Sequence, residues 1–247
     1  MKWIFLPALL CATAVTLAAA EPVPTEVTVR VIARDAKAIY EAVGGAWVTI
    51  TDLRTGEVLA AGAHNGKSSG STQKIMIEPR KRGEIVFDTP GAASFTATIP
   101  LREPAVVEIA AEGPVGHPQA RRSASKTLLL LPGEHLTGDG VVLEIHGLIV
   151  TVDPPKGDGA TVAVEAGVMM ACGCPIEPDG LWNANEFKVT ARLLDAGGEA
   201  LISGPLQWEG GRWRATFPRP QAAPAAVEVV AGHTPTANFG LHRLELK

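Results

Sequence analysis

Residues 45–66 read GAWVTITDLRTGEVLAAGAHNG, and this stretch decides the fold class. Apolar and polar side chains alternate from Trp47 to Asp52, which is the period of a β-strand with one buried face. Arg54-Thr55-Gly56 is a turn sequence, and residues 57–60 continue as a second short strand. The stretch is therefore predicted to be a β-hairpin.

Short strands of the same kind recur along the chain, separated by turn residues. No segment has the sustained apolar stripe with capping residues that is typical of an amphipathic helix. The chain is therefore predicted to be all-β. The predicted strands are 26–33, 47–52, 57–60, 74–78, 84–87, 95–99, 106–110, 127–131, 141–152, 161–168, 187–194, 199–202, 206–209, 212–217, 227–231 and 238–246.

The N-terminus has the pattern of a secretory signal peptide over residues 1–20. One positive charge, Lys2, precedes an apolar run that ends in Ala18-Ala19-Ala20, and cleavage is expected before Glu21. The protein is then predicted to be periplasmic or secreted, without a transmembrane anchor after cleavage. Loss of Lys2 changes the net charge from −4 to −5. These charges are dispersed and do not indicate nucleic-acid binding, which needs a clustered basic face.

The chain after position 20 is predicted to form two β-sandwich domains, 21–140 and 141–247. Glycines and a proline between residues 132 and 140 mark the preferred break. The first residues after 140 can still belong to the first sheet, so the boundary is left open between 132 and 147.

Two parts of the chain resemble known sandwich modules. The hairpin at residues 45–66 resembles the opening hairpin of transthyretin-like and carboxypeptidase-regulatory-like domains. The second half is similar in strand rhythm to bacterial immunoglobulin-like domains and ends in the strand NFGLHRLEL. The resemblance implies two immunoglobulin-like or transthyretin-like β-sandwich domains after a signal peptide, and it implies no activity. Residues 62–73 depart from it as a polar loop that is longer than usual.

The octapeptide MMACGCPI, residues 169–176, is the main candidate for a functional site. It contains two of the four methionines and two of the three cysteines. If it is extended, Met170, Cys172 and Cys174 point to one side and Met169 to the other. Thiolates and thioethers suit Cu(I), and two thiolates also suit zinc.

A histidine that is distant in the sequence is expected to lie near this loop. In an immunoglobulin-like sandwich, the loop at residues 232–237 lies at the same end as the octapeptide, which brings His233 toward the sulfur atoms. The predicted metal ligands are Cys172, Cys174, Met170, Met169 and His233. Copper is the most plausible cofactor, for delivery or sequestration by a non-enzymatic binding protein.

Two other interpretations of the cysteines stay open. Cys172 and Cys174 can form a disulfide that shapes a recognition loop in a structural or interaction module. They can also be a thiol-exchange pair. In each case we expect a protein partner in the periplasm or cell envelope.

The remaining motifs point to structure rather than catalysis. No Gly-x-Ser-x-Gly elbow, phosphate loop or His-Glu-x-x-His pair is identified, so no enzyme is predicted. His64 is expected in a solvent-facing turn and His135 in the interdomain linker. Gly210-Gly211 predicts a two-residue hairpin loop that sets Trp208 opposite Trp213, with these rings packed in the core.

Overall fold

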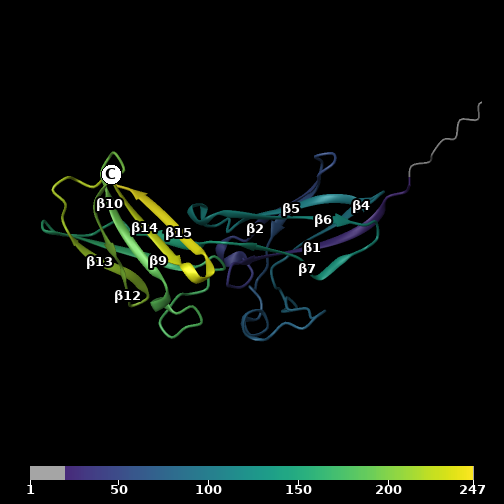
Figure 1. The fold of residues 1–247 in the computed structure, drawn as a ribbon, viewed down its shortest axis with the longest axis horizontal. Helices are drawn as coiled ribbons and strands as arrows, with labels where there is room; N and C mark the ends of the chain where they lie inside the picture. The colour runs from purple at the N-terminus through teal and green to yellow at the C-terminus, as the bar shows by residue number, and fades with distance from the viewer. Residues whose placement is uncertain (1–19, 247) are drawn as a thin grey trace, which may run out of the picture.

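The computed structural model describes residues 20–246 and is all-β, with fifteen strands and five short helical turns in this range. Figure 1 shows an elongated molecule in which the first half of the chain lies at one end and the second half at the other. The predicted signal peptide, 1–20, lies outside the described residues except for Ala20. No helix in the described range is long and apolar enough to span a membrane.

The first half of the chain, residues 23–145, forms two sheets. One has the strand order β4 (Phe95–Leu101), β1 (Val23–Ala33), β7 (Leu136–Ile145). The other has the order β3 (Val58–His64), β2 (Ala46–Asp52), β5 (Ala105–Gly113), β6 (Arg122–Leu130). The predicted hairpin at residues 45–66 is confirmed, because β2 and β3 pair antiparallel, with Ala46 opposite His64.

The second half, residues 148–245, forms two further sheets. One has the order β11 (Ala200–Pro205), β10 (Lys188–Leu194), β14 (Ala226–His233), β15 (Asn238–Glu245). The other has the order β12 (Gln207–Glu209), β13 (Arg212–Pro218), β9 (Thr161–Met170), β8 (Leu148–Val152). The helical turns are η1 (Glu41–Val43), η2 (Gln73–Ile77), η3 (Pro118–Ala120), η4 (Ala184–Glu186) and η5 (Thr234–Thr236).

The hairpin at Gly210-Gly211 is confirmed residue by residue. Trp208 lies opposite Trp213, and Glu209 lies opposite Arg212. Both glycines have positive φ angles, 56° and 86°, which is the conformation that this two-residue turn requires. Trp213 is buried and Trp208 is half-buried, so the pair packs into the sheet as the sequence predicts.

Two predicted strands are wrong. Residues 74–78 and 84–87 lie in a long loop, residues 65–94, which leaves the sheets after β3 and returns at β4. Residues 73–77 form a turn of π-helix, and Val86 and Phe87 pack with Ala38 and Ala93 in a small cluster of their own. The Asp139 side chain accepts hydrogen bonds from the backbone N–H groups of residues 86 and 87, which replaces strand pairing.

The predicted Gly-rich break does not interrupt the first half. β7 runs through Gly138 and Gly140 while it pairs in parallel with β1. The expectation that His135 lies in an interdomain linker is therefore wrong, since its Nδ1 accepts a hydrogen bond from Glu26 N–H on β1 (2.9 Å). The sheets of the first half end at Ile145, and those of the second half begin at Leu148.

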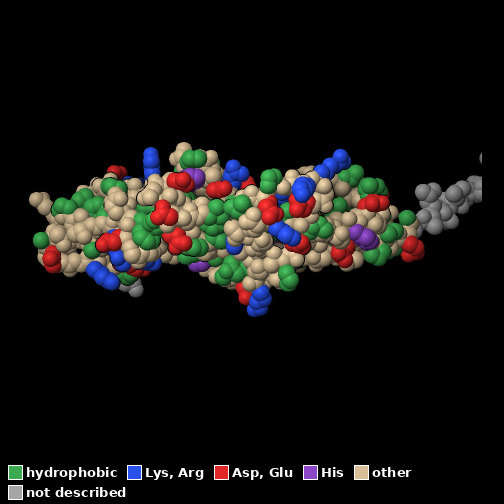
Figure 2. All heavy atoms as spheres, turned by 90° about the horizontal axis from the view of Figure 1, so that it is seen from below, with side chains coloured by type: hydrophobic (Ala, Val, Ile, Leu, Met, Phe, Trp, Pro, Cys, Tyr) green, Lys and Arg blue, Asp and Glu red, His purple; other side chains and the backbone are tan. Residues whose placement is uncertain are grey.

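The two halves share one hydrophobic core. Buried side chains from β1 through β14 form a single connected cluster, which includes residues such as Ile39 and Val43 of the first half and Leu148 and Cys172 of the second. The contact region between the halves is called the junction below. On the face of the molecule in Figure 2, Lys and Arg side chains are interspersed with Asp and Glu.

Candidate functional site

The cysteine stretch is a tight turn and not an extended segment. β9 ends at Met170, whose carbonyl accepts from Gly173 N–H (2.7 Å) and whose N–H donates to the Cys174 carbonyl (3.0 Å). Gly173 has φ +80°, a conformation that favours glycine. The expected extended run from 169 to 174 is therefore wrong, because residues 171–173 reverse the chain direction. We call residues 170–174 the dithiol turn.

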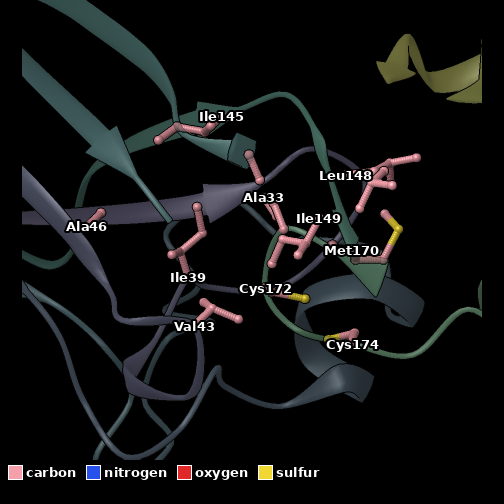
Figure 3. Close-up of a cluster of buried hydrophobic side chains, with 14 of the residues drawn as sticks. Ala33, Ile39, Val43, Ala46, Ile145, Leu148, Ile149, Met170, Cys172 and Cys174 are labelled. Carbon is pink, nitrogen blue, oxygen red and sulfur yellow. The ribbon is translucent and has the colours of Figure 1, made fainter. Parts of the chain in front are cut away.

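The dithiol turn is buried at the junction and does not form an exposed sandwich tip. Cys172 is 0% exposed and Cys174 is 8% exposed. A β-carbon built on Gly173 would lie only 2.8 Å from Cγ1 of Val43, which belongs to η1 in the first half. Figure 3 shows Val43 beside the two cysteines, with Ile39 above it. The first half of the chain thus seals the turn against solvent.

Both cysteines are free thiols in the structure, so the expected disulfide is not formed. The Cys174 thiol donates a hydrogen bond to Cys172 and lowers the pKa of Cys172 to about 7, with a further contribution from the backbone N–H of Lys37. Donation to Cys172 and burial raise the pKa of Cys174. The pair therefore favours one thiolate that is hydrogen-bonded to one thiol.

The other predicted ligands lie apart from the two thiols. The Met170 side chain is buried and points toward Leu148 in Figure 3, away from the cysteines. Met169 is half-buried and lines a surface cavity of about 240 Å³ together with Trp208 and Arg212. The expected alternation, with Met170 on the side of the two cysteines and Met169 on the other, is therefore wrong for Met170.

His233 does not join the dithiol turn. Its ring stacks on Phe187 at 4.9 Å, its Nδ1 lies 2.8 Å from the Thr236 hydroxyl, and its Nε2 lies 4.0 Å from Glu186. Within residues 20–246, no group of three or more His, Cys, Asp or Glu side chains could hold a metal ion. The predicted Cys172–Cys174–His233 ligand set is thus not assembled.

Hydrogen bonds between the two halves stabilise the junction around the dithiol turn. The indole Nε1 of Trp182 donates to the Asp35 carbonyl (2.7 Å). Asn238 is 0% exposed, and its amide donates to the Arg34 carbonyl (2.8 Å) and accepts from Gly147 N–H (2.9 Å). One buried side chain therefore ties together β15, the end of β1 and the connection between the halves.

His64 is buried, which corrects the expectation that it faces solvent. It is the last residue of β3 and is 0% exposed. Its Nε2 accepts a hydrogen bond from Val31 N–H (3.0 Å), whereas its Nδ1 is buried without a partner. Burial, and after it the charge of Arg30, lowers the pKa of His64 to about 4. A neutral imidazole here completes the hydrogen bonding of β1.

One serine motif was missed by the sequence analysis. Residues 66–70 read Gly-Lys-Ser-Ser-Gly, which has Gly-x-Ser-x-Gly spacing. A nucleophile elbow needs this motif between a strand and a helix. Here Ser68 lies in the long loop, its N–H donates to the Gly91 carbonyl, and its hydroxyl accepts from Gly70 N–H (3.0 Å). The motif shapes a loop and is not placed as an elbow.

Comparisons with known proteins identify no family. No protein-family model matches the chain, and no curated protein matches it. Solved structures with some similarity include a DUF3823 family protein from Parabacteroides merdae, with 11% identity and a TM-score of 0.31, covering 92% of this chain and 100% of that one.

Two further solved structures are similarly distant. A DUF3823 family protein from Bacteroides ovatus has 9% identity and a TM-score of 0.31, and covers 91% of this chain and 100% of that one. The fimbrial anchor protein Mfa2 from Porphyromonas gingivalis has 13% identity and a TM-score of 0.20, and covers 90% of this chain and 82% of that one. These values support no transfer of function.

Proposed function

We propose that this chain is an exported, non-catalytic interaction protein of the cell envelope or exterior. Its two predicted domains act as one rigid unit that presents surfaces to a protein partner. The observation that carries the proposal is the junction, where one hydrophobic core is continuous between the halves and the buried Asn238 bonds to both sides.

Rigidity is the physical consequence of such a junction. Neighbouring domains move relative to one another unless their interface is large and hydrophobic. Here, separation would expose core residues such as Val43 and Cys172, and it would leave the Asn238 amide and the Asp35 carbonyl without their partners. Each unpaired buried polar group costs about 1–3 kcal/mol. The two ends of the molecule are therefore held at a fixed separation.

Spin labels at the two ends test this rigidity. Glu103 and Ala196 are exposed, in turns far from the junction at opposite ends of the molecule. Cysteines at these positions, in a Cys172→Ser/Cys174→Ser background, should give a single narrow distance distribution by pulsed electron paramagnetic resonance. Adding Asn238→Ala should broaden it. A broad or multiple distribution in the parent would contradict the proposal.

Export is tested separately from rigidity. Secretion of the full-length chain by a bacterial host should give a mature protein whose first residue, by N-terminal sequencing, is Glu21. A mature protein that retains Met1 or Lys2 would contradict export through a cleaved signal peptide.

A second candidate function is the binding of one soft metal ion by Cys172 and Cys174. The observation that favours it is the pair of free thiols, of which Cys172 has a pKa lowered chiefly by the Cys174 side chain. Cu(I) suits this site best, since soft thiolate ligands select it. Met170 and Met169 point elsewhere, and His233 has other contacts, so the two thiolates would be the protein ligands.

Anaerobic titration of residues 21–247 with Cu(I) against a competing chelator tests this candidate. The parent chain should bind one ion, Cys172→Ser/Cys174→Ser should bind none, and His233→Ala should bind like the parent. Equal binding by the parent and the double variant would exclude the site. The outcome is independent of the spin-label distances, so either proposal can fail alone.

A further inference from the structure

His64 closes a gap at the edge of the first sheet. β4 begins at Phe95, opposite Val29, so β1 has no strand partner on that side beyond this point. The imidazole Nε2 takes the place of the missing strand and accepts from Val31 N–H (3.0 Å). The Val31 carbonyl accepts from Ile39 N–H (2.9 Å). A histidine side chain thus completes the backbone hydrogen bonding of the central strand.

The same histidine lies immediately before the long loop, residues 65–94. Residue 65 follows it directly and forms a two-way backbone bridge with Ser94, where the loop returns. In Figure 1 the loop hangs from one side of the first half, beneath the label of β1. Because Asn65 and Ser94 are hydrogen-bonded to each other, displacement of His64 would disturb both ends of the loop.

The surroundings of His64 favour the neutral imidazole on balance, because burial and the charge of Arg30 outweigh the backbone groups that raise its pKa. Because Nε2 accepts a hydrogen bond, the neutral ring carries its proton on Nδ1. The charged group that acts on the ring is Arg30 of β1, whose guanidinium is held by the carbonyls of Ala92 and Ala93. Residues 39 and 93 contribute backbone groups, and the residue opposite on β2 is Ala46.

Other charged groups nearby already have partners. Glu41 pairs with Lys67 at the base of the loop (2.8 Å). Asp139 of β7 accepts from the backbone of residues 86 and 87 and faces Arg80 at 3.8 Å. No carboxylate in the described part of the chain forms an ion pair with His64 that would stabilise its charged form.

We propose that the long loop, residues 65–94, is released by acid, with protonation of His64 as the trigger. A protonated imidazole has two N–H donors, so Nε2 can no longer accept from Val31 N–H. The added proton also places a positive charge on a buried ring close to the half-buried Arg30, and no carboxylate in the described part of the chain forms an ion pair with that ring. The lost hydrogen bond and the added charge both favour movement of the protonated ring out of its buried site. The end of β3 and the hydrogen bonds between Asn65 and Ser94 then open as well.

Release of the loop would uncover an apolar face of the first sheet. The loop contributes Val86, Phe87 and Ala93 to the cluster that also contains Ala38. The partly buried Ile32 of β1 and Val142 of β7 pack against this cluster. Acid would therefore convert a covered sheet face into an exposed apolar one, while the junction stays closed. This inference is independent of the proposed rigid junction.

Hydrogen–deuterium exchange with mass spectrometry at about pH 7.5 and about pH 4 tests the proposal on the whole chain. After correction for intrinsic exchange, protection of residues 65–94 in the parent should fall by at least about tenfold at the lower pH. Protection of β9 and β14 should fall less. His64→Gln retains a side-chain acceptor that does not titrate, so its loop should stay protected at both pH values.

His135→Gln is the matched control. Nδ1 of His135 also accepts a backbone N–H, from Glu26, but this histidine is exposed. The control should lose loop protection as the parent does. Equal loop protection at both pH values in the parent would overturn the proposal, as would simultaneous loss in β9, β14 and the loop. Loss of protection in His64→Gln equal to that in the parent would also overturn it. The parent measurement decides the question even if His64→Gln does not fold.

Discussion

The indole Nε1 of Trp182 donates a 2.7 Å hydrogen bond to the backbone carbonyl of Asp35. Asp35 has φ +52° in the turn that follows β1, where Ala33 N–H donates to the Lys37 carbonyl. A side chain from the second half of the chain thus fixes a left-handed turn of the first half. The same turn supplies the Lys37 N–H that reaches Cys172.

Trp182→Phe should destabilise the protein by about 1–2 kcal/mol, because the ring still packs but the Asp35 carbonyl loses its donor. Urea unfolding of the two chains measures this difference. Trp47→Phe is the control, since Trp47 is 53% exposed, and its effect should stay within about 0.5 kcal/mol. Equal effects of the two substitutions would contradict a specific role for the indole N–H.

Asn238→Ala should cost about 2–4 kcal/mol. The substitution removes two buried hydrogen bonds and leaves the Arg34 carbonyl and the Gly147 N–H without partners. Thermal and urea unfolding measure the loss. Asn185→Ala, at an exposed position in η4, serves as the control and should change stability by less than about 1 kcal/mol. A loss below this limit for Asn238→Ala would show that Asn238 does not hold the junction.

The strands with a clear two-residue period could be predicted from the sequence because the pattern and the turn chemistry are local. Trp208 and Trp213 pair as expected, since the two glycines between their strands fix the register. Residues 84–87 have a similar apolar pattern but form no strand. Their backbone is satisfied by Asp139, more than fifty positions away, and no local pattern reveals such a partner.

The candidate site was predictable in its composition but not in its setting. The cluster of sulfur-containing residues is evident in the sequence, and Met170, Cys172 and Cys174 are all buried. The dithiol turn lies against Val43, and the Lys37 backbone acts on Cys172, neither of which a sequence pattern can place there. His64 was misjudged for the same reason: the sequence His-Asn-Gly indicates a turn, whereas the ring reaches back to β1.

Gly173→Ala should destabilise the protein by more than Gly211→Ala. Both glycines have positive φ, +80° and +86°, so both variants incur similar backbone strain of about 1 kcal/mol. Only at Gly173 would the new methyl group meet a neighbour, Cγ1 of Val43 at 2.8 Å, whereas nothing lies within 4 Å at Gly211. Urea unfolding of both variants isolates the cost of the junction contact. Equal losses would mean that the turn does not pack against Val43.

The two thiols should give a stability maximum at mildly alkaline pH under reducing conditions. In the folded chain the pKa of Cys172 is lowered to about 7, whereas that of Cys174 is raised. In the unfolded chain both thiols titrate near their ordinary pKa, about 8.5. Between about pH 7 and 8.5 the unfolded chain holds one more proton than the folded chain, so stability rises with pH.

Above about pH 8.5 the sign reverses. The unfolded chain then loses both protons while folded Cys174 keeps its own, so stability falls as the pH increases further. The measurement is the unfolding free energy of the parent minus that of Cys172→Ser/Cys174→Ser at each pH, which cancels the other titrating groups. Cys174→Ala removes the hydrogen-bond donor, so the pKa of Cys172 should rise and the maximum should disappear. A flat difference curve for the parent would mean that the thiols do not share a proton.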